Sequence, residues 1–279
     1  MEKLRTYSEP WDDYELLDAG GGKKLERWGR IITIRPELQA YFKSVESFNE
    51  WRKIAHWEFI ESQGKWKSLI PNSPSKWQLK YNKLVFNLEL TKFKHLGLFP
   101  EQRTNWDWIS KHLTTNDKLL NLFAYTGAMS CISRFQGAET FHIDSVKNVI
   151  TWARNNMESS KLMNIKWVHE DALKFVEREK KRGHQYDFIV MDPPAWGIGV
   201  KGEKWKIEDK IDDLLSLVSE ILSPNGKLLL NTYSPQITHQ TLIELFSLYF
   251  PKKNCELSEL YMKSKTDKHL YCGNLLRVS

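Results

Sequence analysis

Two hydrophobic periods alternate along the second half of the chain. Short apolar runs typical of buried strands are separated by segments whose apolar positions recur every three to four residues, as in amphipathic helices. Such alternation favours a doubly wound, mostly parallel sheet, and two final adjacent runs predict an antiparallel strand at one edge. The predicted strands are 118–126, 139–144, 165–171, 186–192, 227–234, 256–264 and 268–279, and the predicted helices are 106–113, 127–138, 145–162, 172–183, 212–226 with a Pro-Asn-Gly stop, and 241–250.

The first 92 residues follow a different pattern. Short β-like runs are broken by turn residues such as Gly20, Gly21 and Gly22, and residues 76–90 alternate as one half-buried strand would. We therefore predict a small, antiparallel, β-rich domain over residues 1–92 and an α/β domain over residues 93–279.

Composition restricts the kinds of partner and the cellular compartment that are expected for this chain. A net charge of +6 favours an anionic partner, and both nucleic acid and a merely solvated charged surface stay open as explanations. No run approaches the roughly 20 apolar residues of a membrane span, and the amino terminus lacks an apolar signal core, so we expect a cytoplasmic protein without a membrane partner. Cys131, Cys255 and Cys272 are far apart, which predicts reduced thiols and no metal site.

Polar residues stand at the end of each of four successive predicted strands. The first strand leads into a turn that ends at Gly127, the second ends in Asp144, the third in Asp171, and the fourth in Asp192 followed by two prolines. Ligands of open α/β sheets bind at the carboxyl ends of the strands, so this order predicts a binding site. The alternatives are a simple tight turn at Gly127 and helix capping by Asp144 and Asp171.

The first turn also restricts the ligand. A dinucleotide requires several glycines against its pyrophosphate, but this turn has one glycine together with Phe123 and Tyr125. A nucleoside without phosphates fits better, and S-adenosylmethionine is such a ligand. Asp144 would then bind the ribose hydroxyls and Asp171 the adenine amino group, while the turn would pass beneath the methionyl part.

Four segments carry a family resemblance: residues 94–106, 119–130, 142–156 and 188–196. They resemble the class I S-adenosylmethionine-dependent methyltransferases, and in particular the large-subunit ribosomal RNA methyltransferases typified by the 23S rRNA cytosine-5 enzyme. The resemblance implies a Rossmann-like, doubly wound, mostly parallel seven-stranded sheet and action on ribosomal RNA. It implies cofactor binding by Phe99, Gln102, Arg103, Asn121, Phe123, Ala124, Tyr125, Thr126, Gly127, Asp144, Ser145, Asp171, Ala172 and Asp192. For Gln102 and Arg103 the alternative is a helix start with exposed side chains.

One departure from the family changes the expected chemistry. Methylation of cytosine C5 requires a cysteine at the end of the strand after Asp-Pro-Pro, whereas this strand ends at residues 231–234 in Asn-Thr-Tyr-Ser. We therefore expect a nitrogen target, with the carboxylate of Asp192 and the free carbonyls of Pro193 and Pro194 as acceptors that hold an amino group.

Two aromatic residues are candidates for substrate binding. Trp196 could stack on a flipped-out base or be ordinary packing, and Tyr233 is a further pocket candidate. The glycine- and lysine-containing loop over residues 197–210 could be a mobile lid, a phosphate contact or a plain loop.

The resulting hypothesis is a cytoplasmic S-adenosylmethionine-dependent methyltransferase that binds ribosomal RNA and takes part in rRNA processing. A methyltransferase for a protein or small molecule and a non-catalytic RNA-binding protein are the alternatives. The amino-terminal region is shorter than the RNA-binding extension expected for the family, and the sequence does not indicate an oligomeric state.

Overall fold

The structure is a computed structural model that describes residues 4–199, 202 and 204–279. The chain forms two compact units, and each unit is discontinuous in sequence. Unit 1 comprises Met1–Arg5, Asn105–Glu259 and Gly273–Ser279, and unit 2 comprises Thr6–Thr104 and Leu260–Cys272. The division into domains at residue 92 stays a prediction.

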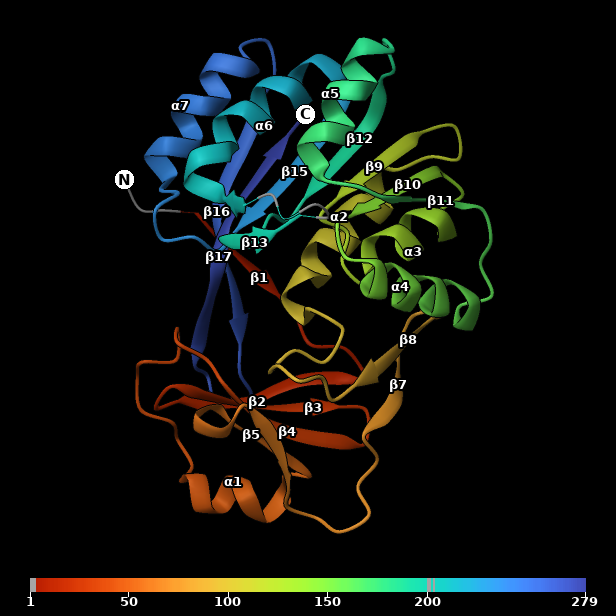
Figure 1. The fold of residues 1–279 in the computed structure, drawn as a ribbon. Coiled ribbons are helices and arrows are strands. Elements are labelled where there is room, and N and C mark those ends of the chain that lie inside the picture. The colour runs from red at the N-terminus through yellow and green to blue at the C-terminus, as the bar shows by residue number, and fades with distance from the viewer. Residues whose placement is uncertain (1–3, 200–201, 203) are drawn as a thin grey trace. The chain divides into compact units, whose positions relative to one another are not determined.

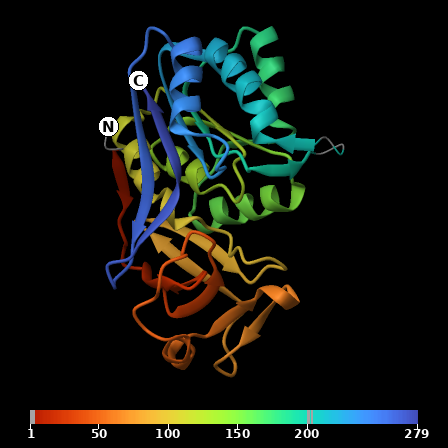
Figure 2. The ribbon, with the colours of Figure 1, turned by 90° about the vertical axis from the view of Figure 1, so that its left-hand side faces the viewer.

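A mixed sheet of eight strands forms the centre of the α/β part (Figure 1). Five neighbouring strands are parallel, and β17 runs antiparallel to β15. Figure 2 shows β16 and β17 side by side along the sheet. In sheet order the strands are β1 (Arg5–Ser8), β16 (Cys255–Lys263), β17 (His269–Val278), β15 (Leu222–Thr232), β12 (Tyr186–Met191), β9 (Lys118–Leu122), β10 (Glu139–Asp144) and β11 (Ile165–His169).

Helices cover both faces of this sheet. Figure 1 shows α3 and α4 on one face and α5, α6 and α7 on the other. In α6 the buried side chains recur every three to four positions, from Ile207 and Ile211 to Leu214 and Val218, and this apolar stripe explains why the segment is helical and packs against the sheet. The helices are α2 (Arg103–His112), α3 (Ala128–Phe135), α4 (Lys147–Ser159), α5 (Ala172–Lys181), α6 (Ile207–Ile221) and α7 (His239–Tyr249).

Two details of the predicted sheet are wrong. The sheet has eight strands instead of the predicted seven, because β1 pairs with β16 and forms the edge in place of the carboxyl-terminal strands. Main-chain pairing of a four-residue strand leaves little trace in a side-chain pattern. The helix over 212–226 ends earlier than predicted, at Ile221, because the Pro-Asn-Gly segment belongs to β15.

Unit 2 contains a five-stranded sheet and a separate hairpin. The prediction of a purely antiparallel domain is wrong, because β4 and β5 are parallel and α1 lies between them in the chain. Residues 76–90 form two strands instead of one, with Asn82 in the left-handed conformation at the turn. The elements are β2 (Tyr14–Gly20), β3 (Lys23–Trp28), β4 (Ile31–Pro36), α1 (Phe48–Ile54), β5 (Trp57–Ile60), η1 (Glu61–Gln63), β6 (Lys65–Ser68), β7 (Lys76–Tyr81), β8 (Leu84–Glu89) and η2 (Pro100–Gln102).

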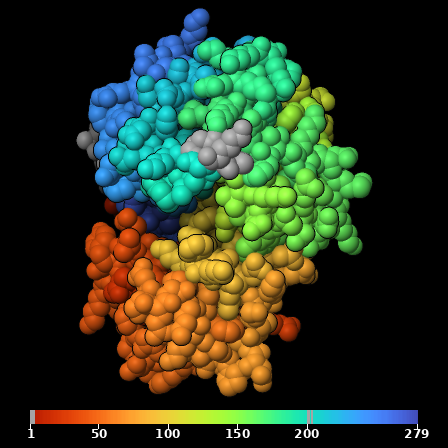
Figure 3. Space-filling view, viewed as in Figure 1, coloured from red at the N-terminus to blue at the C-terminus, as the bar shows by residue number. Residues whose placement is uncertain are grey.

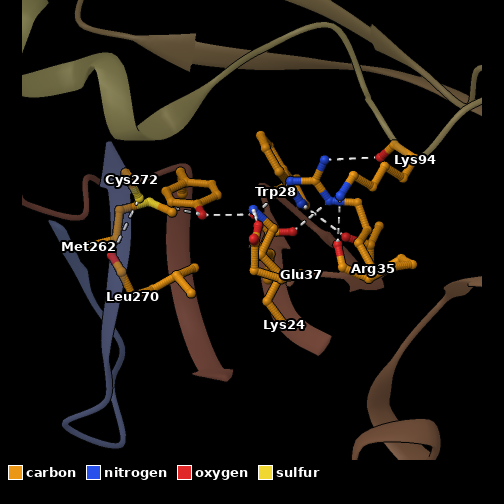
Figure 4. A network of polar contacts seen from close by, with 12 residues as sticks. Lys24, Trp28, Arg35, Glu37, Lys94, Met262, Leu270 and Cys272 are labelled. Atoms are coloured by element: carbon orange, nitrogen blue, oxygen red, sulfur yellow. Dashed lines mark hydrogen bonds and ion pairs between the residues drawn. The ribbon is translucent and has the colours of Figure 1, made fainter. Parts of the chain in front are cut away.

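Unit 2 contains a network of largely buried charged groups, of which Figure 4 labels Lys24, Arg35 and Glu37. Arg35 donates two hydrogen bonds to Glu26, of 2.7 and 2.8 Å, and the Tyr14 hydroxyl donates a third, of 3.0 Å. Lys24 lies 3.7 Å from Glu26 and 3.2 Å from Glu37. Each buried charge in this set therefore has an opposite charge beside it, which is the condition under which charged groups are tolerated in a protein interior.

Within the described residues, the helices are all too short or too polar to cross a bilayer.

Candidate active site

The four predicted strand ends lie on one edge of the sheet. Strands β12, β9, β10 and β11 are consecutive neighbours and parallel, so their carboxyl ends point the same way. The chain proceeds from β9 to β10 and β11 and then returns to the other side of β9 to form β12. The strand order therefore reverses between β9 and β12, where open α/β sheets bind their ligands.

The turn after β9 is strained. Phe123 and Tyr125 have φ angles of +55° and +49°, a left-handed conformation that residues with a side chain seldom adopt. Hydrogen bonds hold the turn in place: Ala124 N donates to Ile143 O at 3.0 Å and Tyr125 N to an Asp144 carboxylate oxygen at 2.8 Å. Such strain costs of order 1–3 kcal/mol per residue and clusters at ligand sites.

Gly127 ends this turn and precedes α3. Its φ angle is +78°, and an added Cβ would lie 2.8 Å from Ala153 Cβ and 3.3 Å from His142 Cε1. The close approach of α4 and β10 therefore requires glycine here, so the tight-turn alternative explains this residue without a ligand.

Buried hydrogen bonds between β9, α3 and β10 support the turn that follows β9. Asn121 Nδ2 donates to Ser130 Oγ at 2.9 Å, and Ser130 Oγ lies 3.0 Å from His142 Nδ1. Burial, with Arg154 nearby, lowers the pKa of His142 to about 3, so this imidazole is neutral, and its tautomer decides which partner of the Ser130 contact donates. Asn156 Nδ2 binds the carbonyl of Thr126 at 2.9 Å. The Asn121 amide is thus committed to the fold, and cofactor contact by Asn121 or Thr126 stays a prediction.

Asp144 ends β10 and faces the strained turn. One carboxylate oxygen accepts from Tyr125 N and the other from Val146 N, both at 2.8 Å. Helix α4 has Val146 as its N-cap, so Asp144 does not cap this helix and the capping alternative is wrong for it. Burial raises the pKa of Asp144. Each carboxylate oxygen retains a second lone pair, which suits it to the two adjacent hydroxyls of a ribose.

Asp171 does cap a helix. Its Oδ1 accepts a hydrogen bond of 3.1 Å from Lys174 N at the start of α5, and Ala172 is buried behind it. The capping alternative therefore holds for Asp171, whose second oxygen has the capacity to accept from an amino group. The neighbouring Glu170 is paired with Arg178.

The Asp-Pro-Pro turn after β12 corrects one predicted role. Asp192 is half-buried and Pro193 is buried, but the Pro194 carbonyl is not free, because Trp205 Nε1 donates a hydrogen bond of 2.6 Å to it. The buried Trp205 ring also packs on Phe123, with ring centroids 4.7 Å apart. A single indole thus joins the turn after β12 to the turn after β9.

Trp196 and Tyr233 both reach the surface. The Trp196 side chain is 62% exposed, so the ordinary-packing alternative is wrong, and Tyr233, just after β15, is 36% exposed. The predicted loop over 197–210 is largely a hairpin of β13 (Trp196–Ile198) and β14 (Lys204–Lys206), followed by α6. Residues 200, 201 and 203 of that loop lie outside the described residues.

Three predicted cofactor residues belong to unit 2. Phe99 packs against the His95 ring, Gln102 is buried in η2, and Arg103 donates to the carbonyls of Glu9 and Pro10. The alternative of exposed side chains is therefore wrong for Gln102. The role of these three residues toward a ligand stays a prediction, as do those of Ala124 and Ser145.

None of the three thiols resembles an activated nucleophile. Cys131 and Cys272 are buried and Cys255 is exposed at the start of β16. Burial raises the pKa of all three thiols, in Cys131 to about 12. A nucleophilic cysteine requires the opposite shift, because the thiolate is the reactive form.

Comparison with known proteins identifies the family. A family model described as S-adenosylmethionine-dependent methyltransferase matches residues 46–254. The chain belongs to this family. The predicted enzyme class, methyl donor and family resemblance are thereby confirmed.

The methyltransferase has curated relatives that are themselves longer. It is 30% identical over 230 residues to ribosomal RNA large subunit methyltransferase I of Aeromonas salmonicida, a match that covers 79% of this chain and 54% of the relative. It is 29% identical over 151 residues to ribosomal RNA large subunit methyltransferase K/L of Pseudoalteromonas atlantica, covering 53% of this chain and 21% of the relative. The chain thus spans between about a fifth and about half of the length of these relatives.

Solved structures confirm the predicted α/β architecture. An S-adenosylmethionine-dependent methyltransferase from Agrobacterium tumefaciens superposes with a TM-score of 0.91 at 32% identity, covering 98% of this chain and 92% of the other. A putative methyltransferase in complex with SAH shares the fold, with a TM-score of 0.78 at 19% identity, covering 95% of this chain and 75% of the other.

The residues at the strand ends fit S-adenosylmethionine. Asp144 offers two carboxylate oxygens with acceptor capacity, and Asp171 offers a second carboxylate at the end of the adjacent strand. The first turn has left-handed residues at Phe123 and Tyr125 in place of a run of glycines. Among the described residues, no group of three or more His, Cys, Asp or Glu side chains is placed to hold a metal ion.

Sequence reasoning missed Trp205 and the Ser130–His142 pair. The alternation Lys204-Trp205-Lys206 is a strand pattern with an inward tryptophan, and this was the available signal for Trp205. Ser130 and His142 lie 12 residues apart and meet only because α3 packs on β10, so no local signal exists for them.

Proposed function

We propose that this methyltransferase transfers a methyl group to a base nitrogen of large-subunit ribosomal RNA, with Asp192 as the residue that receives the target amino group. The choice of nitrogen is carried by the segment at the end of β15, which reads Asn-Thr-Tyr-Ser over residues 231–234 and has no cysteine. The raised pKa of all three thiols agrees with it. Attack on a cytosine ring requires a thiolate, whereas an amino group carries its own lone pair. A ribosomal substrate would place the protein in the cytoplasm.

The reaction places modest demands on the protein. S-adenosylmethionine supplies a methyl group on a sulfonium, which is already activated for displacement. The chain has to hold the amino nitrogen in line with that methyl group, and to accept or share a proton from it as it becomes positive. Asp192 stands at the end of β12, beside the β9 strand end, and its carboxylate is the acceptor suited to this task.

The carbonyls of Pro193 and Pro194 have different roles in the proposed reaction. Since Trp205 occupies the Pro194 carbonyl, the Pro193 carbonyl is the remaining main-chain acceptor in the proposal. The Pro194 contact has a different effect, because it fixes the turn that carries Asp192. Trp196 follows two residues later and offers a flat, exposed surface on which a flipped-out base could stack.

Two observations support RNA as the substrate. Both curated relatives described above are named as ribosomal RNA large subunit methyltransferases. In addition, unit 2 has five exposed lysines between Glu61 and Glu89, an interval without any acidic residue. Such a segment suits contact with a phosphate backbone. The five are Lys65, Lys67, Lys76, Lys80 and Lys83.

The test is methyl transfer to ribosomal RNA from cells that lack the gene. We expect purified protein with labelled S-adenosylmethionine to modify large-subunit RNA, and mass spectrometry of the nucleosides to find the methyl group on a base nitrogen. Asp192→Asn should lower turnover by about 10²- to 10⁴-fold and leave cofactor affinity within about tenfold, ~1.4 kcal/mol. Asp213→Asn, which changes an exposed carboxylate of α6, is the matched control.

Three results would contradict the proposal. Label in protein or in a small molecule, with none in RNA, would replace the substrate class. A methyl group on cytosine C5 would refute the nitrogen target. Cofactor binding by calorimetry with no transfer to any substrate would support a non-catalytic RNA-binding protein.

A further inference from the structure

The hairpin that follows the Asp-Pro-Pro turn has two dissimilar faces. Trp196 pairs with Lys206 and Ile198 with Lys204, and side chains of directly paired residues share a face of a β ladder. All four of these residues are exposed, with Trp196 at 62% and Ile198 at 57%. Gly197 and Trp205 form the other pair and lie on the opposite face, where Trp205 is buried. Figure 3 shows this turquoise segment at the surface of unit 1.

The inner face explains how a hairpin this short keeps its position. The Trp205 ring packs on Phe123, and its Nε1 donates to the Pro194 carbonyl. Ile207 N also donates to Ala195 O at 3.1 Å, which closes the base of the hairpin. The exposed tryptophan and isoleucine are therefore not the loose end of a chain but are fixed to the two turns of the active site.

The outer face combines two apolar side chains with two cations. Contiguous exposed apolar surface is a feature of binding sites, whereas single scattered apolar residues are ordinary, and here Trp196 and Ile198 share one face of an anchored hairpin. An aromatic ring next to lysines suits an unpaired nucleic-acid strand, since bases stack on the ring and phosphates contact the cations. Lys206 lies 4.0 Å from Asp209, a distance that leaves its ammonium available to a phosphate.

We propose that the outer face of the β13–β14 hairpin, formed by Trp196, Ile198, Lys204 and Lys206, binds an unpaired RNA strand at the target nucleotide. The inference rests on the proposed function and deepens it, because it selects unpaired RNA over duplex. A duplex keeps its bases stacked on one another and presents no free base face to Trp196.

The test measures binding of a fluorescently labelled, unpaired RNA oligonucleotide and of the same sequence as a duplex, by anisotropy at several salt concentrations. Trp196→Ala should weaken binding of the unpaired strand by roughly 5- to 150-fold, and Trp196→Phe should retain most of the affinity because it keeps a ring. The double variant Lys204→Gln/Lys206→Gln should lower the slope of log K against log salt by about 1.4. Lys252→Gln, an exposed lysine elsewhere in unit 1, should leave both affinity and slope unchanged.

One result would refute this inference and leave the proposed function intact. In it the wild type methylates ribosomal RNA, and Trp196→Ala and the double lysine variant bind unpaired RNA with the same affinity and salt slope as the wild type. The inference also fails if sedimentation shows that Trp196→Ala dissociates a dimer, because a second copy of the chain would then cover this face. If the wild type neither binds nor methylates RNA, the proposed function itself is wrong. The substituted positions are all exposed, so the variants should fold. Thermal unfolding of each variant checks this.

Discussion

In unit 2 the buried charges bind one another, whereas in unit 1 the strand-end carboxylates of Asp144 and Asp171 bind backbone N–H groups. Glu26 is enclosed by Arg35, Lys24 and Tyr14. Asp144 instead accepts from two main-chain nitrogens and stays partly open to solvent. Glu26 is buried and enclosed by its partners, whereas Asp144 is half-buried and keeps acceptor capacity for a ligand.

The pKa shifts separate the two sites in the same way. Burial alone would raise the pKa of Glu26, but Arg35 and Lys24 outweigh burial and hold it below its ordinary value. At Asp144 burial prevails and the pKa is raised. A carboxylate that is neutralised by its neighbours contributes to stability, and an acid with a raised pKa at a strand end is a candidate for ligand binding. Substitutions in unit 2 and in unit 1 test this difference separately.

The largest expected effect is on stability, in unit 2. Glu26→Gln removes the charge that compensates Arg35 and should lower the free energy of unfolding by about 3–5 kcal/mol, because it leaves a buried cation without its partner. Urea denaturation measures this loss. The comparison variant is Glu256→Gln, which breaks the ion pair between Glu256 and Arg277. These two residues lie 3.4 Å apart and the Glu256 side chain is 52% exposed, so the free energy of unfolding should fall by less than about 1 kcal/mol. Equal stability of the two variants would contradict a structural role for the network.

The next effect is on cofactor affinity, in unit 1. Asp144→Asn should raise the dissociation constant for S-adenosylmethionine by about 10- to 100-fold, ~1.4–2.7 kcal/mol, because the amide replaces one acceptor oxygen with a donor. Isothermal titration calorimetry gives this constant directly. An unchanged constant would remove Asp144 from the site and leave it as a support for the Tyr125 turn.

Asp171 offers a sharper version of the same experiment, since it has both a capping and a proposed ligand role. Asp171→Ser keeps a good helix cap, so the free energy of unfolding should change by less than about 0.5 kcal/mol. Any loss of cofactor affinity in this variant then reports on the ligand alone. Asp171→Ala should lose affinity and, in addition, about 1 kcal/mol of stability. If the serine variant binds the cofactor normally, Asp171 is only a cap.

The sequence was most informative where a local pattern determines the structure. The five parallel strands and their order of polar ends follow from hydrophobic period and turn residues, which act over a few positions. Helix α1 was also within reach, because Ser47-Phe48-Asn49-Glu50 is a capping-box pattern, and Glu50 N does bind Ser47 Oγ at 3.2 Å. The β-like runs on both sides of this seven-residue helix obscure its signal in the sequence.

The remaining features depend on contacts between distant residues. Strand β1 joins the sheet by main-chain pairing with β16, more than 200 positions away in the sequence. The occupation of the Pro194 carbonyl depends on Trp205, which approaches only because a hairpin folds back. Glu26 and Arg35 are nine residues apart on paired strands, and their burial depends on the whole of unit 2. No pattern within a short window contains this information.

Trp205 tests whether the two turns of unit 1 act together. Trp205→Phe keeps a ring against Phe123 but loses the hydrogen bond to Pro194, so stability should fall by about 1 kcal/mol. Turnover should fall about tenfold, ~1.4 kcal/mol, with cofactor affinity changed less than threefold, since the turn that carries Asp192 is loosened while Asp144 is unaffected. Steady-state kinetics and calorimetry on one preparation check this. Equal losses in turnover and affinity would show that the indole supports the whole site.

The smallest expected effect is on the pH dependence of stability, which should have opposite signs for Glu58 and Asp144. Hydrogen bonds from Arg52, opposed by burial and aided by Lys23, lower the pKa of Glu58 in unit 2 to about 2. A depressed pKa stabilises the folded protein above the ordinary value of 4.5, and this contribution is lost as pH falls from there toward 2. The advantage of the wild type over Glu58→Gln should therefore shrink between pH 7 and pH 3.

Asp144 should behave in the opposite way. Its raised pKa means that the folded state binds the proton more tightly than the unfolded state, so the wild type loses stability as pH rises above the ordinary value of 3.8. Relative to Asp144→Asn, the wild type should therefore be less stable at pH 7 than at pH 3. Thermal unfolding of both variants and the wild type across this range measures the two trends. Trends of the same sign would show that both acids are stabilised by their neighbours, and the contrast between the two units would then fail.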